Sequence, residues 1–223
     1  MTTLTNVNQK NAVTVCDVLK PSTPSPEFLY EKGVSLEYAH NVNEQWFVLR
    51  VSYGKELIAY KYLKSEGFTV FLPFVERVKI DKEGKKHRYK KSLLPNLLFV
   101  QSSYEKITAL LKHTVSLSFL HFYYDRTRKN EQGKNPPLII ANDKMENFIS
   151  IISVQNEHVK VSKLELCHFK SNDKVRVVHG SFSGVEGRVS RLSGQQRVVV
   201  EVEGLCAIAT AYIPTAFLKK INK

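Results

Sequence analysis

Cysteine is scarce in this 223-residue sequence, which contains only Cys16, Cys167 and Cys206. The three lie far apart, none forms a Cys-x-x-Cys pair, and none has a histidine at close spacing. Zinc sites and disulfide frameworks both depend on such clusters. The sequence therefore predicts reduced thiols and no structural metal.

Long hydrophobic runs are missing too. No stretch reaches the roughly 20 apolar residues that a membrane-spanning helix needs. The first six residues contain neither the basic segment nor the apolar segment of a signal peptide. We therefore expect a cytoplasmic protein that makes no contact with a membrane.

Recognisable catalytic motifs are also missing. The seven histidines show no metal-ligand spacing such as His-x-x-x-His, and none lies in a nucleophile motif. The glycine-flanked segment 180–184 lacks the Lys-Ser/Thr pair of a phosphate-binding loop. We expect no enzymatic activity, no cofactor and no catalytic metal.

Acidic residues are few relative to basic ones. The chain has 33 Lys and Arg against 21 Asp and Glu, which gives a net charge of +12. An excess of this size favours an anionic partner, usually nucleic acid. Within residues 77–91 only Asp81 and Glu83 oppose the positive charge. The cations that we expect to bind nucleic acid there are Lys82, Lys85, Lys86, Arg88, Lys90 and Lys91.

Apolar residues are interleaved with these cations. Val78, Ile80 and Tyr89 fit a two-stranded arm that has residues 81–84 at its tip. One interpretation is that the arm binds nucleic acid through its cations. The other is a solvated hairpin whose charges merely prevent edge-to-edge aggregation. Both interpretations fit the sequence.

Residues 92–100 form a nearly unbroken apolar run, which is typical of a central strand buried on both faces. Ser102 and Glu105 have the spacing of a capping box. Apolar residues follow at helical spacing and predict a helix over 103–113.

The other periodic segments continue this alternation. We expect strands at 46–51, 68–74 and 115–124, a helix over 55–66, and a last helix that begins at Asn142. Its buried face would contain Met145, Phe148, Ile149 and Ile152. This order of elements predicts an α+β domain whose sheet is covered on one side by helices.

Changes in composition divide the chain. Residues 1–43 are rich in Thr, Asn and Ser and are interrupted by prolines, which predicts a flexible leader. Residues 44–152 form the α+β domain, and residues 153–169 are expected to be a linker. Residues 170–223 consist of short strands separated by glycines, which is typical of a small β-barrel.

Residues 173–189 resemble the KOW motif of NusG and ribosomal proteins, in which apolar alternation precedes a Gly-x-Phe and a second glycine follows five residues later. The first domain strengthens the resemblance, because its Trp-Phe-Val-Leu, Gly-Lys-Glu and Phe-Leu-Pro segments and the run Leu-Pro-Asn-Leu-Leu-Phe-Val are similar to an NGN domain. Residues 44–222 thus resemble the NusG/RfaH superfamily of transcription factors. Residues 135–140 and 145–149 are most similar to UpxY-type antiterminators of capsular polysaccharide operons.

The resemblance implies an NGN-like sheet covered by helices, followed by an SH3-like KOW barrel. It also implies that an apolar patch on the first domain grips the clamp helices of RNA polymerase. NusG typically has Phe-Pro-Gly-Tyr where this chain has Leu-Pro-Asn-Leu, so the patch stays apolar but loses a ring and a glycine. Ordinary core packing is the other interpretation of the two leucines. The implied contact residues are Trp46, Phe47, Leu94, Pro95, Asn96 and Leu97.

Phe182 is the implied contact of the KOW domain with a ribosomal protein or the termination factor Rho. It could instead seal one end of the barrel, and the sequence leaves both possibilities open.

The favoured function is a transcription antitermination or elongation factor that binds RNA polymerase and suppresses pausing or termination on selected operons, with polysaccharide biosynthesis as the expected target. Nucleic acid of the elongation complex would be a second partner. The alternative is a direct RNA-binding or ribosome-associated KOW protein, whose main surface would be the basic arm.

Overall fold

The computed structural model describes Tyr38 and residues 43–52, 54–162 and 169–221. After the gap at 163–168, side chains are described from Lys174 onward. The predicted leader, residues 1–43, lies outside the described residues except for Tyr38 and Asn43.

The first sheet is antiparallel and is built around β1 (Gln45–Val51). Its strand order is β2 (Thr69–Phe71), β5 (Leu97–Ser102), β1 and β6 (Leu120–Phe122), and β7 (Ile139–Ile140) also pairs with β1. The long apolar stretches expected to be strands thus meet at the centre, where Val48 pairs with Phe99.

Helices cover both faces of this sheet. α1 (Glu56–Ser65) and α2 (Tyr104–His113) pack on the face that contains Phe47 and Leu49. α3 (Asn142–Ser153) packs on the opposite face, where its Phe148 meets Phe99 with ring centroids 5.2 Å apart. The expectation that helices cover one side only is therefore wrong. Alternation explains the result, because the four successive residues 46–49 of β1 are all apolar and therefore place apolar side chains on both faces.

Several predicted boundaries move for local reasons. β5 begins at Leu97 and not at residue 92, because Asn96 has a positive φ of 64° and turns the chain. Ser103, and not Ser102, caps α2 by accepting a hydrogen bond from the Lys106 amide at 3.3 Å. The expected strand over 115–124 contains a 3₁₀ turn (Val115–Leu117) before β6.

The second sheet is six-stranded, with the order β13 (Leu218–Lys220), β9 (Phe169–Val177), β10 (Glu186–Leu192), β11 (Gln195–Val202), β12 (Cys206–Ala209) and β8 (Lys160–Ser162). Among the described residues no pairing joins β13 to β8, so the closed SH3-like barrel that we expected is not found. Gly187 is needed within this sheet, because a Cβ there would lie 2.4 Å from the Val199 carbonyl oxygen.

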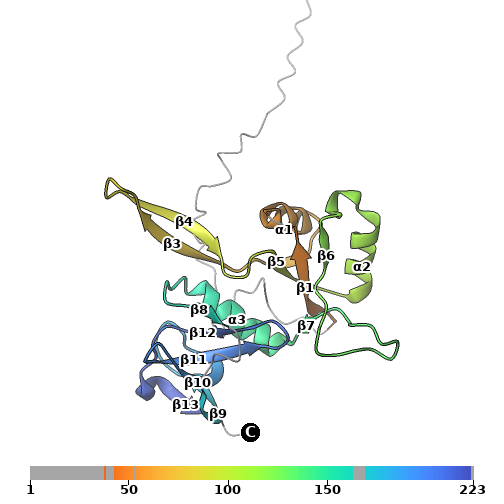
Figure 1. Cartoon of the computed structure of the whole chain (residues 1–223). Helices are drawn as coiled ribbons and strands as arrows, with labels where there is room; N and C mark the ends of the chain where they lie inside the picture. The colour runs from red at the N-terminus through yellow and green to blue at the C-terminus, as the bar shows by residue number, and fades with distance from the viewer. Residues whose placement is uncertain (1–37, 39–42, 53, 163–168, 222–223) are drawn as a thin grey trace, which may run out of the picture.

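α3 lies between the two sheets (Figure 1) and contacts β1 on one side and β11 and β12 on the other. One apolar cluster consequently runs from Phe99 through Phe148 to Val198 and Ile208. Part of the segment expected to be a linker is also a strand, because β8 pairs with β12. The structure therefore has a shared core and an added strand at the junction of the predicted domains.

Candidate nucleic-acid interface

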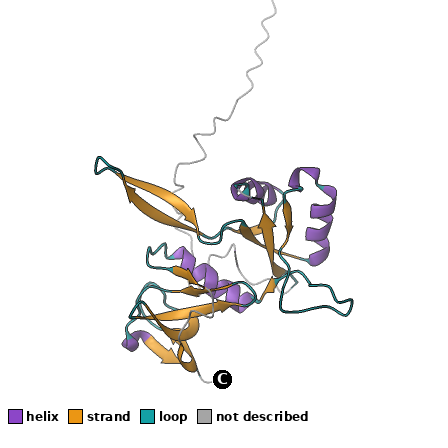
Figure 2. Ribbon diagram, in the orientation of Figure 1, coloured by secondary structure: helices purple, strands orange, loops and turns teal. Residues whose placement is uncertain are grey.

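The predicted basic arm is a two-stranded hairpin of β3 (Phe74–Ile80) and β4 (Lys86–Ser92), which projects away from both sheets (Figures 1 and 2). Asp81 organises its tip by accepting hydrogen bonds from the amides of Glu83 at 2.9 Å and Lys85 at 2.8 Å. The Asp81 carboxylate also lies 2.7 Å from His87 Nε2. The hydrogen bond with His87 has the largest effect, and together these bonds hold the pKa of Asp81 below its usual value.

The cations of the arm reach solvent on both of its faces. Residues paired across the strands share a face, so Val78 and Arg88 lie together, while Lys79 and His87 lie on the other side. Val78 is 54% and Ile80 is 60% exposed, so one face combines apolar and basic side chains. All the arm residues expected to bind nucleic acid are exposed: Lys82, Lys85, Lys86, Arg88, Lys90 and Lys91.

The base of the arm is held by the segment that follows α3. The Gln155 side-chain amide accepts a hydrogen bond from the Glu76 amide at 3.1 Å and donates one to the Phe74 carbonyl oxygen at 3.2 Å. Arg77 donates to the carbonyl oxygens of Glu157 and Val159. The arm therefore leaves the body in a fixed direction.

Arg197 of β11 holds the same segment from the second sheet. It is almost fully buried and donates to the His158 carbonyl oxygen at 2.6 Å and to the Thr210 carbonyl oxygen at 2.7 Å. Burial lowers the pKa of this guanidinium. The carbonyl oxygens of residues 157 and 159 thus accept from Arg77 of the arm, and the one between them, at residue 158, accepts from Arg197. This alternation links the arm to the second sheet. No feature of the sequence indicates this link.

We expect Gln155→Ala to loosen the base of the arm without unfolding the protein. The variant loses the two hydrogen bonds to the edge of β3, each of which contributes on the order of 1 kcal/mol. Amide hydrogen exchange in residues 74–77 should become several-fold faster, while the melting temperature changes little. Gln132→Ala, in an exposed loop, is the matched control. Equal exchange in both variants would show that Gln155 does not hold the arm.

The residues implied to contact polymerase divide into two groups. Trp46 is 1%, Phe47 is 0% and Leu94 is 9% exposed, so these side chains lie in the core. A direct contact of Trp46, Phe47 or Leu94 with a partner is therefore excluded in this conformation, and we correct that expectation. Pro95 is exposed, and Asn96 and Leu97 are half-buried.

The face of the first sheet that carries α3 is open at one end. Leu97 on β5 pairs with Arg50 on β1, which in turn pairs with His121 on β6, so the three side chains lie in a row across one face. Arg50 and His121 are exposed, whereas Trp46 and Val48 on the same face are covered. The sequence does contain a signal for this open end, because Arg50 interrupts the apolar run of β1.

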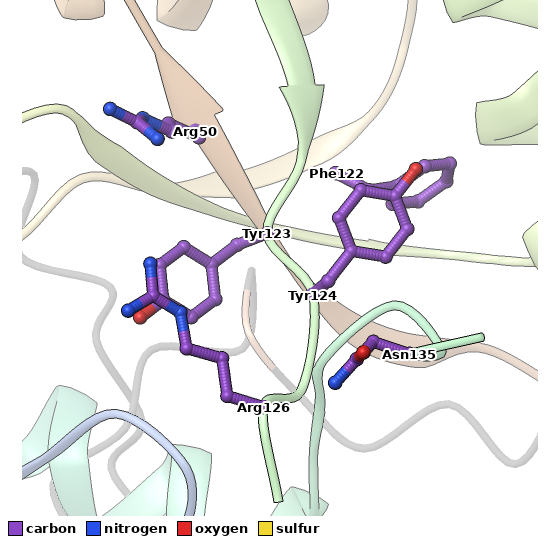
Figure 3. A pocket seen from close by; sticks show the side chains of 6 residues that line it. All are labelled: Arg50, Phe122, Tyr123, Tyr124, Arg126 and Asn135. Atoms are coloured by element: carbon purple, nitrogen blue, oxygen red, sulfur yellow. The ribbon is translucent and has the colours of Figure 1, made fainter. Parts of the chain in front are cut away.

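A pocket of about 370 Å³ lies beside Arg50, where β6 ends (Figure 3). It was not expected from the sequence, in which residues 125–135 read only as a polar loop. Its walls are aromatic, cationic and amide side chains: Arg50, Phe122, Tyr123, Tyr124, Arg126 and Asn135.

Phe182 is not at the surface. It is 4% exposed and belongs to the same apolar cluster as Val175 and Val198. The turn between Gly180 and Gly184, both with positive φ, directs it into the core. The burial of Phe182 agrees with a packing role. Its contact with a ribosomal protein or Rho stays a prediction, and that contact would require Phe182 to leave the core.

The first sheet is thus antiparallel, with helices on both faces, one open end and a projecting basic arm. Within the described residues no group of three His, Cys, Asp or Glu could hold a metal ion, and no helix is long and apolar enough to cross a membrane.

Residues 44–149 match the protein family described as "Transcription termination factor nusG". A comparison with curated proteins found no match. The family match supports a place for this region in the NusG/RfaH superfamily, and with it a general role in transcription elongation or termination. Proteins of this family are transcription factors that bind RNA polymerase, and they are not enzymes. The match stops within α3, so it says nothing of the second sheet.

Proposed function

We propose that this protein is an elongation factor that binds RNA polymerase through residues 44–152 and suppresses pausing or termination on selected operons. The observation that carries the proposal is the combination, within the NusG-type region, of an open sheet end with an anchored, exposed basic arm. The first surface suits a protein helix and the second suits the phosphates of the elongation complex. Operons for polysaccharide biosynthesis are the proposed targets, on the resemblance of residues 135–140 and 145–149 to UpxY-type antiterminators.

The proposed polymerase contact is the open end of the sheet. Leu97 lies there with the exposed Pro95 beside it and Arg50 across from it. The clamp helices would pack on the apolar part, and Arg50 would pair with acidic side chains at the rim. Phe182 is buried and offers no exposed ring to a partner of the second sheet. A ribosomal protein or Rho would therefore have to bind the second sheet at another place.

Leu97→Asp should weaken polymerase binding by about thirtyfold or more, which is the loss expected at an interface hot spot. A buried carboxylate at this contact is costly at any salt concentration, so the loss should persist at high salt. Val115→Asp, at a site between α2 and β6 that is 89% exposed, is the matched control. Binding would be measured by biolayer interferometry on core polymerase, with melting temperatures to confirm folding. Equal affinity of the two variants would place the contact elsewhere.

In vitro transcription tests the function itself. Purified protein added to polymerase on a template from its own operon should increase read-through of a downstream terminator. Pull-down of core polymerase against ribosomal subunits from lysate separates this function from the alternative. Unchanged read-through on every such template, together with no polymerase binding, would leave the RNA-binding or ribosome-associated function in its place.

A further inference from the structure

We propose that the second sheet sets the direction of the basic arm, and that Arg197 of β11 is the positioning residue that transmits this setting. The base of the arm is held by the segment between α3 and β8, residues 154–159. If the second sheet moves away from α3, this support moves with it, and the cations of the arm then point in other directions. The coupling is built into the fold and does not depend on which partner the arm binds.

The two ends of segment 154–159 belong to different parts of the protein. The segment leaves α3, which packs on the first sheet, and enters β8, which pairs with β12 of the second sheet. Asn156 orders the turn between them, because its carbonyl oxygen accepts from the Val159 amide at 3.1 Å and its Oδ1 accepts from the His158 amide at 2.8 Å. A turn that is ordered in this way carries a displacement of β8 to the base of the arm.

The second sheet is seated on the first domain by contacts outside this segment. Asn147 Oδ1 on α3 accepts a hydrogen bond from the Glu186 amide of β10 at 2.8 Å. The turn between β11 and β12 approaches the first domain so closely that a Cβ at Gly204 would lie 2.9 Å from the Leu138 side chain. The second sheet therefore has a defined position from which it can direct the segment.

Arg197 does something that an apolar residue at its position could not do. It is 3% exposed, and among the described residues its acceptors are all neutral oxygens: the carbonyls of His158 and Thr210, and Gln195 Oε1 at 2.9 Å. Its Nε has no partner in the described part of the chain. Burying a cation with neutral partners alone is unfavourable, and an apolar side chain of similar size often stabilises a core as well. The guanidinium adds direction, because it fixes the His158 carbonyl oxygen relative to that of Thr210.

The arm and the second sheet hold the same piece of backbone. Arg77 donates to the carbonyl oxygens on either side of the one that Arg197 holds. Neighbouring carbonyl groups are joined by rigid peptide units, so release of the His158 carbonyl lets the other two turn away from Arg77. Loss of Arg77 frees the same backbone from the side of the arm. Coupling between two sites has this reciprocal form.

Amide hydrogen exchange of the full chain, measured by mass spectrometry, tests the coupling in both directions. Arg197→Met keeps a long side chain and should make exchange in residues 74–77 several-fold faster, although Arg197 donates no hydrogen bond to them. Arg77→Met should in return accelerate exchange around Val198, whose amide donates to Thr210 Oγ1 at 3.0 Å. Neither measurement involves polymerase or nucleic acid, so the result is independent of the proposed function.

The double variant shows whether the two arginines act as one unit. Arg77→Met combined with Arg197→Met should exchange only slightly faster in residues 155–160 than the faster single variant, because either substitution already frees the segment. Rates that multiply in the double variant would mean that the two arginines act independently, which would contradict the coupling.

Arg188→Met is the matched control, because it removes a half-buried guanidinium of the same sheet whose ion pair is with Glu201 of β11. It should leave exchange in residues 74–77 as in the wild type. Arg197→Lys keeps one donor for a carbonyl oxygen, should exchange at an intermediate rate, and serves as the test if Arg197→Met does not fold. Faster exchange confined to the second sheet, with residues 74–77 unchanged, would show that Arg197 stabilises only its own sheet and would overturn the proposal.

Discussion

Phe182→Ala should lower the free energy of unfolding by about 3–5 kcal/mol, which is the cost of removing a buried phenylalanine. Phe182 is 4% exposed and packs in the cluster that also contains Phe148 and Val198. Its loss leaves a cavity beneath β9 and β10 that their backbones cannot fill. A loss of this size is a large fraction of the roughly 5–15 kcal/mol by which a typical domain is stable.

The measurement is chemical denaturation of the full chain, followed by circular dichroism. Phe182→Leu should recover part of the loss because it refills much of the cavity, and Tyr212→Ala should cost little because Tyr212 is exposed. Since the cluster continues into α3 and β5, we also expect faster amide exchange in α3. Wild-type stability of Phe182→Ala, with a lost partner interaction, would contradict the core position.

The sequence predicted the arm because its signal is local. A cation-rich stretch with interleaved β-branched and aromatic residues and a glycine at the tip has few alternatives to a hairpin. The helical face of α3 was predicted for the same reason, and Met145, Phe148, Ile149 and Ile152 are all buried. Periodicity within one element is sufficient to identify its apolar face.

The surface assignments were harder because burial depends on what packs from elsewhere. Trp46 and Phe47 lie on opposite faces of β1, and both are covered because helices occupy both faces. Phe182 could be placed at the rim or in the core, and the inward turn decided the matter. The pocket combines residues from β1, β6 and a loop 85 positions further along than Arg50, so no spacing in the sequence could indicate it.

Neutralising the arm should have the largest effect on nucleic-acid binding. Replacing Lys85, Lys86, Arg88, Lys90 and Lys91 with alanine removes five exposed cations and leaves the pairing of β3 with β4 in place. Each cation that neutralises a phosphate contributes about 0.9 to the slope of log K against log salt on a duplex. If all five contact phosphates, the slope should fall by about 4 to 5.

We expect a decrease in slope of this size to depend on where the charges lie, and not on the net charge alone. A control that replaces an equal number of exposed lysines on the body, Lys61, Lys112, Lys160, Lys174 and Lys219, lowers the net charge by the same amount. It should change the slope far less, because these side chains are not gathered on one projecting element. Titrations of a duplex across a range of salt concentrations measure both.

Polymerase binding by the arm variant should remain close to wild type, because the proposed contact is the open end of the sheet around Leu97 and Pro95. The two sets of substitutions should therefore have different effects. Leu97→Asp should weaken polymerase binding at any salt concentration, whereas the arm variant should lose the salt-dependent part of the affinity for nucleic acid. A slope that the arm variant leaves unchanged would mean that the exposed lysines only keep the edges of β3 and β4 from aggregating. The hairpin would then be a solvated structural element. The contact with nucleic acid would have to come from the loop of residues 125–135 beside the pocket.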